Sequence, residues 1–592
     1  MTDHLPQTSR GRLSLFIGLT SLAALAAAQP APLHFFMLGD SQINRTMTDG
    51  VAKQMGYTPY ANAGNFPGAV YVNGDGKVQG ILIGLRQGFT TFAPNNLGTL
   101  TGPAPSISNA AAAAVRFFSN NGFFSARMAG LAQGFTSEAH TWTREDGTVG
   151  KPGQPTDVIR SIRFSYKADG LLIQGPSFMQ GADVGMSVTG APVVMGFTSS
   201  IRPLLASQLT PIMKTQNQID REVAMDLRLL SGNGQLLPAV QRKQLIYFEQ
   251  GQDWVQPAWL YDVVQTTPAG LKQPDYIVVP AAVNSPEPVA LHFDFHGLPP
   301  TLGNPQDGSQ PPPPASDPVS QPPPLSLNNL FADNGSGAIG ALTPAAQANP
   351  VQIGEYIVRE DHPCWLNDAN AFWGSLAFTN AAAFWLPQKN RLDYYWDYRW
   401  LWEPDPGPPS IGDNSPWYPG HVHFALIEGH GAPWVITCYK DYGNGPGSNV
   451  VHLNQIAGYG TNQVPGEITS YIMWQSCDVI PEPGHPYEWD FQSPASAFDV
   501  WWQIFKGMRG NYGYRTLMHI CNGVGNSFGV KIGLGLPNLW SWLDATDHSA
   551  FNHSNGWDYG SAVIVSGHEN DRLYDNAQLP NPGSLTIWWI HA

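Results

Sequence analysis

A run of prolines between Pro299 and Pro324 is the feature that most constrains the fold of this chain. Eleven residues of this stretch are proline, and Gly, Ser, Gln and Asp fill most of the gaps. Proline removes a backbone donor and fixes φ, so the stretch favours an extended spacer over helix or sheet. With 592 residues there is enough chain for a folded part on each side. The sequence therefore predicts two parts, at 31–295 and 336–592, joined by a linker at 296–335.

Tryptophan content supports this division, because the two parts differ sharply in it. Three tryptophans precede the linker and seventeen follow it. The chain carries a net charge of −15, which argues against binding a phosphate backbone, so nucleic acid is not an expected partner.

The N-terminus has the pattern of an export signal. Arg10 and Arg12 precede an apolar run that ends in Ala26, Ala27 and Ala28. A basic start, an apolar segment of this length and small residues at its end are typical of a secretory signal peptide, here 1–28. No later stretch has the length and apolarity of a membrane span, so we expect a secreted or extracytoplasmic protein without stable membrane association. Four cysteines are too few for a disulfide scaffold.

The part at 31–295 has the pattern of an α+β domain. Ser106 can cap a helix that runs to Asn121, and a second helix is expected within 216–230. Strands are expected around Ile162 to Tyr166, at 193–197, 244–249, 258–265 and 276–283, with a turn at Asp169-Gly170. A helix followed by several strands, twice over, resembles the cystatin-like propeptide modules found ahead of secreted peptidases. The resemblance is carried by 161–175 and 255–264, and a binding or spacer domain is the alternative.

The part at 336–592 alternates apolar strands with helices. Strands are predicted at 354–360, 424–427, 471–474 and 516–521, and helices at 367–378 and 495–508. Apolar strands separated by helices favour a largely parallel α/β sheet covered on both faces. Functional residues of such sheets collect beyond the carboxyl ends of the strands.

Two of these strand ends carry residues that can perform chemistry. One strand is followed by Glu428-Gly429-His430-Gly431, and the next by Gln475-Ser476-Cys477-Asp478. A nucleophilic cysteine needs a base or a cation nearby to form its thiolate. Neighbouring strands lie about 4.8 Å apart, so an imidazole and a thiol at matching ends come within reach of each other. The glycine at 431 leaves its N–H free to face a substrate carbonyl.

This pattern resembles the caspase-like cysteine peptidases, a group with caspases, gingipains, legumains and clostripain. A His-Gly ends one apolar strand there and a cysteine ends the next, and Gln-x-Cys is the caspase context. Arg-Gly follows the cysteine in caspases, whereas Asp478 and Val479 follow it here. The chain is also similar to an uncharacterised group of secreted proteins with the same strand ends.

The resemblance implies a His-Cys dyad that hydrolyses peptide bonds in a protein or peptide substrate, in a protein made as a zymogen. Cys477 would be the nucleophile, His430 the proton donor, and the backbone of Gly431 and Cys477 the oxyanion site. Secondary candidates near these positions are Gln475, Asp478, Glu428 and Glu403. No cofactor or metal is required, although some relatives bind calcium (Ca²⁺) and this acidic chain could do so too.

Two other functions remain open. The tryptophans at 394–402 and Trp540 with Trp542 could line a groove for a glycan, with paired carboxylates hydrolysing it. A catalytically inactive caspase-like interaction module is the third interpretation. His421 and His423 could form half of a metal site, which is the less favoured interpretation. His519 and Cys521 share a strand face and are expected to be core, with a contribution to a site as the alternative.

Overall fold

The computed structural model shows an α/β protein with a large mixed sheet and few helices. It describes residues 32–61, 68–83, 88–100, 103–124, 131–145, 156–175, 179–200, 202–230, 237–249, 253–266, 272–287, 351–357, 392–396, 419–429, 431–437, 450–453, 456, 458–460, 467–481, 500–519, 522–548 and 557–591. The predicted signal peptide, linker and helix at 367–378 lie outside these residues, as does most of the helix predicted at 495–508, of which 500–504 is helical.

The C-terminal half contributes a parallel sheet to which two antiparallel strands are added. The parallel strands lie in the order β16 (Leu392–Trp396), β15 (Ile353–Ile357), β17 (Phe424–Glu428), β21 (Tyr471–Gln475) and β22 (Gly510–Tyr514). The antiparallel strands β23 (Gly560–Val565) and β24 (Ser584–His591) follow. All five residues of β17 and of β21 are buried, as expected for strands covered on both faces.

A strand predicted at 516–521 is wrong in position. The strand is β22, which ends at Tyr514, and residues 515–519 form turns and irregular backbone beyond it. Gly510 and Gly513 disguise this strand, since glycine is normally depleted in strands. Gly513 packs closely against Ile480, because a Cβ there would lie 3.0 Å from Ile480 Cδ1. His519 therefore belongs to a strand-end loop rather than to a strand face.

The N-terminal half is α+β, and its predicted elements are present. The helices are α1 (Arg45–Met55), α2 (Ile107–Asn120) and α3 (Gln216–Leu230). Ser106 caps α2 by accepting a hydrogen bond from the Asn109 N–H at 3.4 Å. Gly122, with φ +77°, follows the helix in the left-handed region where glycine is favoured.

Antiparallel strands make up most of the N-terminal sheet. One series has the order β2 (Thr58–Pro59), β3 (Gly68–Val72), β4 (Val78–Ile83), β5 (Phe89–Phe92), β10 (Pro192–Ser200), β9 (Met179–Met186), β7 (Thr156–Ala168) and β6 (Leu131–Glu145). A second series contains β12 (Ala239–Glu249), β13 (Trp254–Thr266) and β14 (Lys272–Pro280), linked to β7 through β8 (Leu171–Gln174), with β1 (Phe36–Leu38) and β11 (Leu204–Ala206) at its edge.

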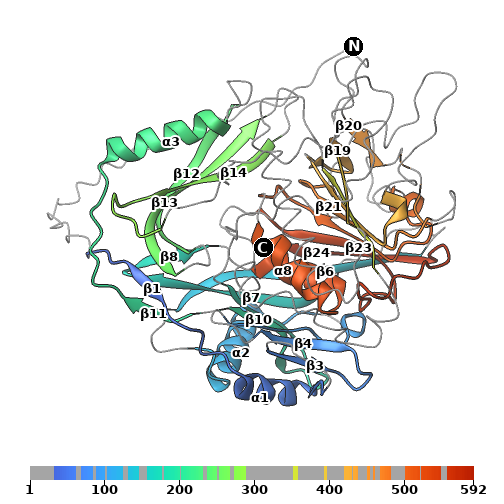
Figure 1. Ribbon diagram of the computed structural model, residues 1–592. Coiled ribbons are helices and arrows are strands. Elements are labelled where there is room, and N and C mark those ends of the chain that lie inside the picture. The colour runs from blue at the N-terminus through green and yellow to red at the C-terminus, as the bar shows by residue number, and fades with distance from the viewer. Residues whose placement is uncertain are drawn as a thin grey trace, which may run out of the picture.

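The two halves share one sheet and one core. Strand β24 pairs antiparallel with β6 over eight residues, so the sheet runs from one half into the other (Figure 1). One hydrophobic cluster contains Val70 and Ile81 of the N-terminal half together with Leu426 and Trp542 of the C-terminal half. Part of the apolar core of each half is therefore packed against the other, while other clusters belong to one half alone.

Two helices of the C-terminal half lie where the halves meet. They are α8 (Asn522–Gly533) and α9 (Asn538–His548), and α9 contacts β7 and β9 as well as β22, β23 and β24. All eleven residues of α9 are buried. In Figure 1, α8 lies at the centre of the molecule above β6 and β7. Because α9 is buried on every side, it belongs to the core rather than to the surface.

The remaining elements are short. They are the strands β18 (Gly431–Ala432), β19 (Val435–Thr437) and β20 (Val450–His452), which form a small separate sheet, and the 3-10 helices η1 (Leu97–Thr99) and η5 (Pro419–His421). Within the described residues, none of the helices has the length and apolarity needed to cross a bilayer.

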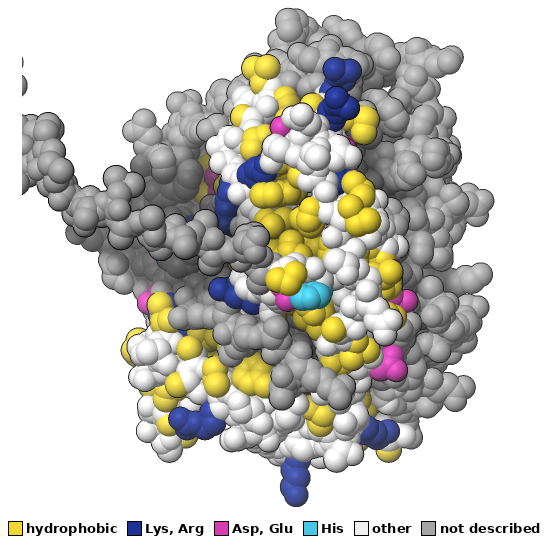
Figure 2. Space-filling view, turned by 90° about the vertical axis from the view of Figure 1, so that its left-hand side faces the viewer, with side chains coloured by type: hydrophobic (Ala, Val, Ile, Leu, Met, Phe, Trp, Pro, Cys, Tyr) yellow, Lys and Arg dark blue, Asp and Glu magenta, His cyan; other side chains and the backbone are white. Residues whose placement is uncertain are grey.

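The side of the molecule that carries β1, β11 and α3 is turned to the viewer in Figure 2. Apolar groups lie there among polar ones, and exposed apolar side chains of these elements include Met37, Leu205 and Met225. Scattered apolar residues of this kind are normal on protein surfaces.

Candidate active site

The two strand ends singled out in the sequence are neighbours in space. Strands β17 and β21 pair in parallel, with Glu428 opposite Gln475 at their last positions. The segments that leave these strands therefore emerge at the same edge of the sheet. Cys477 is the second residue after β21, while His430 lies outside the described residues.

Gly431, the residue after His430, lies directly against the cysteine segment. A Cβ built on Gly431 would be 2.4 Å from the carbonyl oxygen of Cys477 and 2.9 Å from Ser476 Cβ. No side chain fits in that space, so the close approach requires glycine at this position. The chain that follows one strand end is thus packed onto the residue that carries the thiol.

The Cys477 thiol is buried, with 3% of the residue exposed, and is a free cysteine within the described part of the chain. Its Sγ accepts a hydrogen bond from the Met518 N–H at 3.4 Å and lies 3.8 Å from the Met518 carbonyl oxygen. Burial raises the pKa of Cys477 to about 12, and Asp478 and Asp558 add to the rise, while the Met518 hydrogen bond opposes it. In this conformation the sulfur is a protonated thiol at neutral pH.

The secondary candidates near the strand ends differ in burial and backbone conformation. Glu428 and Gln475 are buried to 1% and 2% exposure, and Asp478 adopts a left-handed φ of 55°, a strained conformation for a residue other than glycine. Gln475 Oε1 and Ser476 Oγ are buried with no hydrogen-bond partner among the described residues. Glu403 lies outside the described residues. Buried polar atoms without partners are rare in proteins and are more common at functional sites.

His519 follows the residue that binds the thiol, and it is paired with Asp558, which acts electrostatically on Cys477. The Asp558 carboxylate accepts a hydrogen bond from the His519 backbone N–H at 2.6 Å and lies 2.7 Å from His519 Nδ1. Both residues are 1–2% exposed. Burial opposes the charged imidazole, but Asp558, helped by Asp275 and Asp262, outweighs it and raises the pKa of His519.

The sequence held only a weak signal for this pair. His519 was expected to be core because it was assigned to a strand, and Asp558 stands alone before the apolar run of β23. In the structure Asp558 has a left-handed φ of 66°. Its N–H donates to the Leu517 carbonyl at 2.8 Å, which ties the segment before β23 to the loop after β22.

The N-terminal half covers the His519 side of this site. The Tyr276 ring, on β14, lies 4.9 Å from the His519 ring, and the Trp557 ring lies 5.2 Å away on another side. Asp275 and Asp262, which influence the charge of His519, also belong to the N-terminal half. The imidazole is thus shielded from solvent partly by residues that are far away in the sequence.

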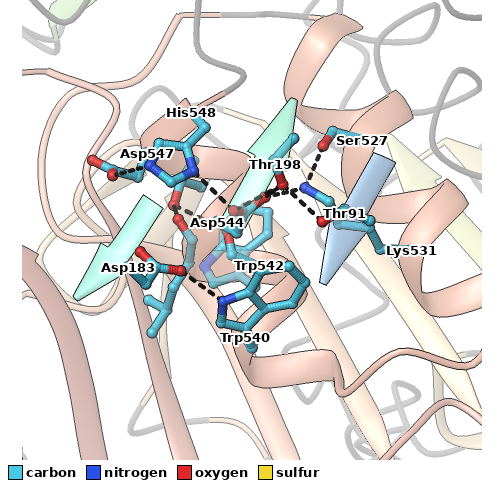
Figure 3. Close-up of polar contacts among 12 residues, drawn as sticks. Thr91, Asp183, Thr198, Ser527, Lys531, Trp540, Trp542, Asp544, Asp547 and His548 are labelled. Atoms are coloured by element: carbon cyan, nitrogen blue, oxygen red, sulfur yellow. Dashed lines mark hydrogen bonds and ion pairs between the residues drawn. The ribbon is translucent and has the colours of Figure 1, made fainter. Parts of the chain in front are cut away.

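A second group of buried polar residues lies around α9 (Figure 3). Asp547 and His548 on α9 contact Ser161 on β7, which in turn bonds to Asp183 on β9, and Asp544 on α9 is bonded to His548. His548 Nδ1 lies 2.8 Å from Asp544, and His548 Nε2 lies 2.9 Å from Ser161 Oγ and 3.0 Å from Asp547. This sequence of atoms resembles a Ser-His-Asp triad.

The chemistry of this group is nevertheless that of a structural ion network. Burial opposes the charge on His548, but the Asp544 and Asp547 carboxylates outweigh it and raise its pKa to about 10, so the imidazole is a cation and no base. The Ser161 hydroxyl is buried and also bonds to Asp183 and Asp547. Lys531 on α8 is ion-paired with Asp544. The polar side chains of this network therefore hydrogen-bond or ion-pair with one another, and they connect the two halves.

This network is also a poor fit for a metal. Asp183, Asp547 and His548 offer three ligand atoms within 4.8 Å of one another. A protonated imidazole has no lone pair to donate, and calcium prefers six to eight oxygen ligands. For the described residues we therefore derive no metal chemistry.

Trp540 and Trp542, two of the tryptophans proposed to line a glycan groove, are buried. Trp540 donates to Asp183 at 2.7 Å, and Trp542 donates to the Gly513 and Ser561 carbonyls at 3.0 Å. Both are at most 1% exposed. The expectation that these two line a groove was wrong, because large amphipathic rings fill the core between α9 and the sheet. Most of the cluster at 394–402 lies outside the described residues.

Comparisons with known proteins add little. No protein-family model matches the chain, and no curated protein matches it. An uncharacterised protein from Eubacterium rectale is 10% identical, with a TM-score of 0.26 over 44% of this chain and 86% of its own. The YpeB C-terminal domain of Bacillus megaterium is 12% identical, with a TM-score of 0.20 over 41% of this chain and 94% of its own. Similarities this weak support no conclusion about fold or function.

Proposed function

We propose that this protein is an exported cysteine peptidase of the caspase-like type, or a close relative, with His430 and Cys477 as its dyad. The observation that carries the proposal is the parallel, in-register pairing of β17 and β21, with Gly431 packed against Cys477. A His-Gly after one strand and a cysteine after its neighbour is the arrangement on which the resemblance rests. The predicted signal peptide supports export, and the N-terminal half is proposed to be the cystatin-like, propeptide-like part.

The proposed reaction is hydrolysis of a peptide bond through a covalent intermediate. The Cys477 thiolate attacks the scissile carbonyl, and His430 donates a proton to the leaving amine. The backbone N–H groups of Gly431 and Cys477 hold the negative oxygen that forms on the carbonyl. Water then hydrolyses the acyl-enzyme and releases the second product.

Burial of the thiol indicates that the described conformation is a latent one. A sulfur with 3% residue exposure and a pKa near 12 does not attack a substrate. Tyr276 of the N-terminal half lies against His519, at the same end of the sheet. We therefore propose that the chain is made as a zymogen and that a cut in the linker at 296–335 loosens this cover.

An activity-based thiol probe tests the proposal. A peptidyl acyloxymethyl ketone is offered to the full chain before and after cleavage at a protease site introduced within 296–335. We expect labelling of Cys477 only after the cut, because only then does the thiol become accessible and ionise. Labelling should be lost in Cys477→Ala and in His430→Ala. Cys438→Ala and His34→Ala are the matched controls and should keep it.

The burial of Cys477 also favours a second function, that of a catalytically inactive interaction module. A free cysteine without a chemical role is typically buried and behaves as a small apolar residue. The same experiment separates the two functions. A cleaved chain that keeps its fold and remains unlabelled by the probe would overturn the peptidase proposal and leave the interaction module.

A further inference from the structure

The loop after β22 contacts the sulfur of Cys477 through the backbone of Met518, on both its N–H and its carbonyl side. Met518 donates its N–H to Sγ at 3.4 Å. The same loop is tied to the cysteine segment by the Asp478 N–H, which donates to the Thr516 carbonyl at 3.0 Å. Residues 516–518 therefore set the immediate surroundings of the thiol.

Asp558 fixes this loop through the residue that follows Met518. One carboxylate oxygen accepts from the His519 backbone N–H at 2.6 Å and the other lies 2.7 Å from the ring Nδ1. Two bonds to one residue hold both its backbone and its ring orientation. The Asp558 N–H and the Tyr559 N–H bond to Leu517 and Thr516, which secures the loop from the same side.

The charge of Asp558 needs compensation in this place. A carboxylate at 2% exposure is costly unless it is paired, and His519 is its ion-pairing partner. The carboxylate by itself disfavours a thiolate at Cys477, as does Asp478. A protonated His519 cancels the charge of Asp558. Asp275 on β14 and Asp262 on β13 also act electrostatically on the ring and favour its charged form.

The second nitrogen of the His519 ring does not take part in the contact with Asp558. Its Nε2 is buried and has no hydrogen-bond partner among the described residues. A structural histidine in a core normally has both nitrogens bonded. The unpartnered nitrogen indicates a histidine that serves the site.

We propose that His519 and Asp558 are positioning residues for Cys477. Asp558 holds the loop that aims the Met518 N–H at the sulfur, and the imidazolium of His519 cancels the charge of Asp558, so that a thiolate can form. The inference rests on the proposed function, because it matters for catalysis only if Cys477 is the nucleophile. The ion pair acts on the thiol without touching a substrate.

The test is a double-mutant cycle on the reactivity of the thiol. The chain cleaved within 296–335 and its variants His519→Gln, Asp558→Asn and the double variant, cleaved in the same way, are treated with iodoacetamide across pH 6 to 10. Modification of the Cys477 peptide is then followed by mass spectrometry. The rate reports the thiolate fraction of this one cysteine, whether or not the protein is a peptidase. His568→Gln, which removes a half-buried histidine paired with Asp571, is the matched control.

We expect a pattern of modification rates that a purely structural role of His519 does not produce. His519→Gln leaves the Asp558 charge uncompensated and should slow modification at pH 8 by about tenfold or more. The double variant removes both charges and should regain most of the wild-type rate. Asp558→Asn should give an altered pH profile, because His519 then loses the partner that keeps it charged.

Two outcomes would overturn the inference. Faster modification in His519→Gln means that the residue only shields the thiol, and equal loss in the single and double variants means that the two charges are not coupled. The double-mutant cycle can give the expected rates while the ketone probe never labels the wild type. That combination rejects the peptidase proposal, and the ion pair then only adjusts the ionisation of the thiol.

Discussion

At the scale of single residues, Gly431 is the contact on which the candidate site depends. A Cβ at this position would meet the Cys477 carbonyl at 2.4 Å and Val479 Cγ2 at 2.8 Å. Backbone cannot yield as a flexible side chain can, so Gly431→Ala should lower the free energy of unfolding by about 1–3 kcal/mol. Urea denaturation measures this loss.

Gly50→Ala is the matched control for that substitution. Gly50 lies inside α1 with nothing within 4 Å of the position of a Cβ. Alanine has the higher helix propensity, so this change should leave the stability unchanged or raise it by up to about 1 kcal/mol. Equal stability of the two variants would mean that the strand ends have more freedom than the structure shows.

Lys531 is a second case in which a single side chain matters, because its ammonium group is ion-paired with the fully buried carboxylate of Asp544. Both Lys531 and Asp544 have no exposed side-chain surface. Lys531→Met leaves Asp544 with the His548 imidazole and the Thr198 hydroxyl. It should cost about 3–5 kcal/mol of stability, the usual loss when one member of a buried pair is removed. Chemical denaturation checks it.

The exposed pair Arg45–Asp49 provides the comparison. Its side chains are 61% and 42% exposed, and its atoms lie 3.7 Å apart. Arg45→Gln should therefore change the stability by less than about 1 kcal/mol. A similar small effect for Lys531→Met would show that the buried network contributes little to stability.

At the scale of elements, the sequence predicted those strands whose signal is local. Apolar runs at 424–427 and 471–474 indicated β17 and β21 within one residue, and Ser106 correctly indicated the start of α2. Strand β22 was misplaced because two glycines mask it, and this error hid the location of His519. The pair His519–Asp558 could not be inferred, since it depends on β23 lying antiparallel beside β22.

Helix α9 should make the stability of the protein depend on pH. The pKa of His548 is raised from 6.5 to about 10 in the folded state. A raised pKa means that this contribution is complete below pH 6.5 and is lost as the pH rises toward 10. The free energy of unfolding should thus fall between pH 6.5 and 8.5, with a slope approaching about 1.4 kcal/mol per pH unit from this group.

His548→Gln isolates this contribution from the other groups that titrate. Urea denaturation at several pH values should give a flatter profile for this variant than for wild type. The control His34→Gln, outside the network, should keep the wild-type slope. Parallel profiles for wild type and His548→Gln would contradict the charged state of this imidazole.

At the scale of the whole molecule, the connection between the halves is what the sequence could not predict. The linker and the contrast in tryptophan content indicated two parts, yet β24 continues the sheet of β6. Pairing between strands more than 430 residues apart leaves no local pattern in the sequence. The residues of an apolar edge strand indicate a strand but do not indicate which strand it pairs with. Buried Arg572 adds to the connection by donating to the Val78 and Gly535 carbonyls.

This connection changes what a cut in the linker can do. A propeptide that only rests on an enzyme dissociates after cleavage, whereas these halves share β24–β6, a hydrophobic core and the network around α9. We expect the chain cleaved within 296–335 to elute from size-exclusion chromatography as one species of the original size. Urea should be needed to separate its fragments. Release of the N-terminal half in native buffer would contradict the shared core, whereas retention means that activation must proceed by loosening the contact around Tyr276 and His519 rather than by losing a domain.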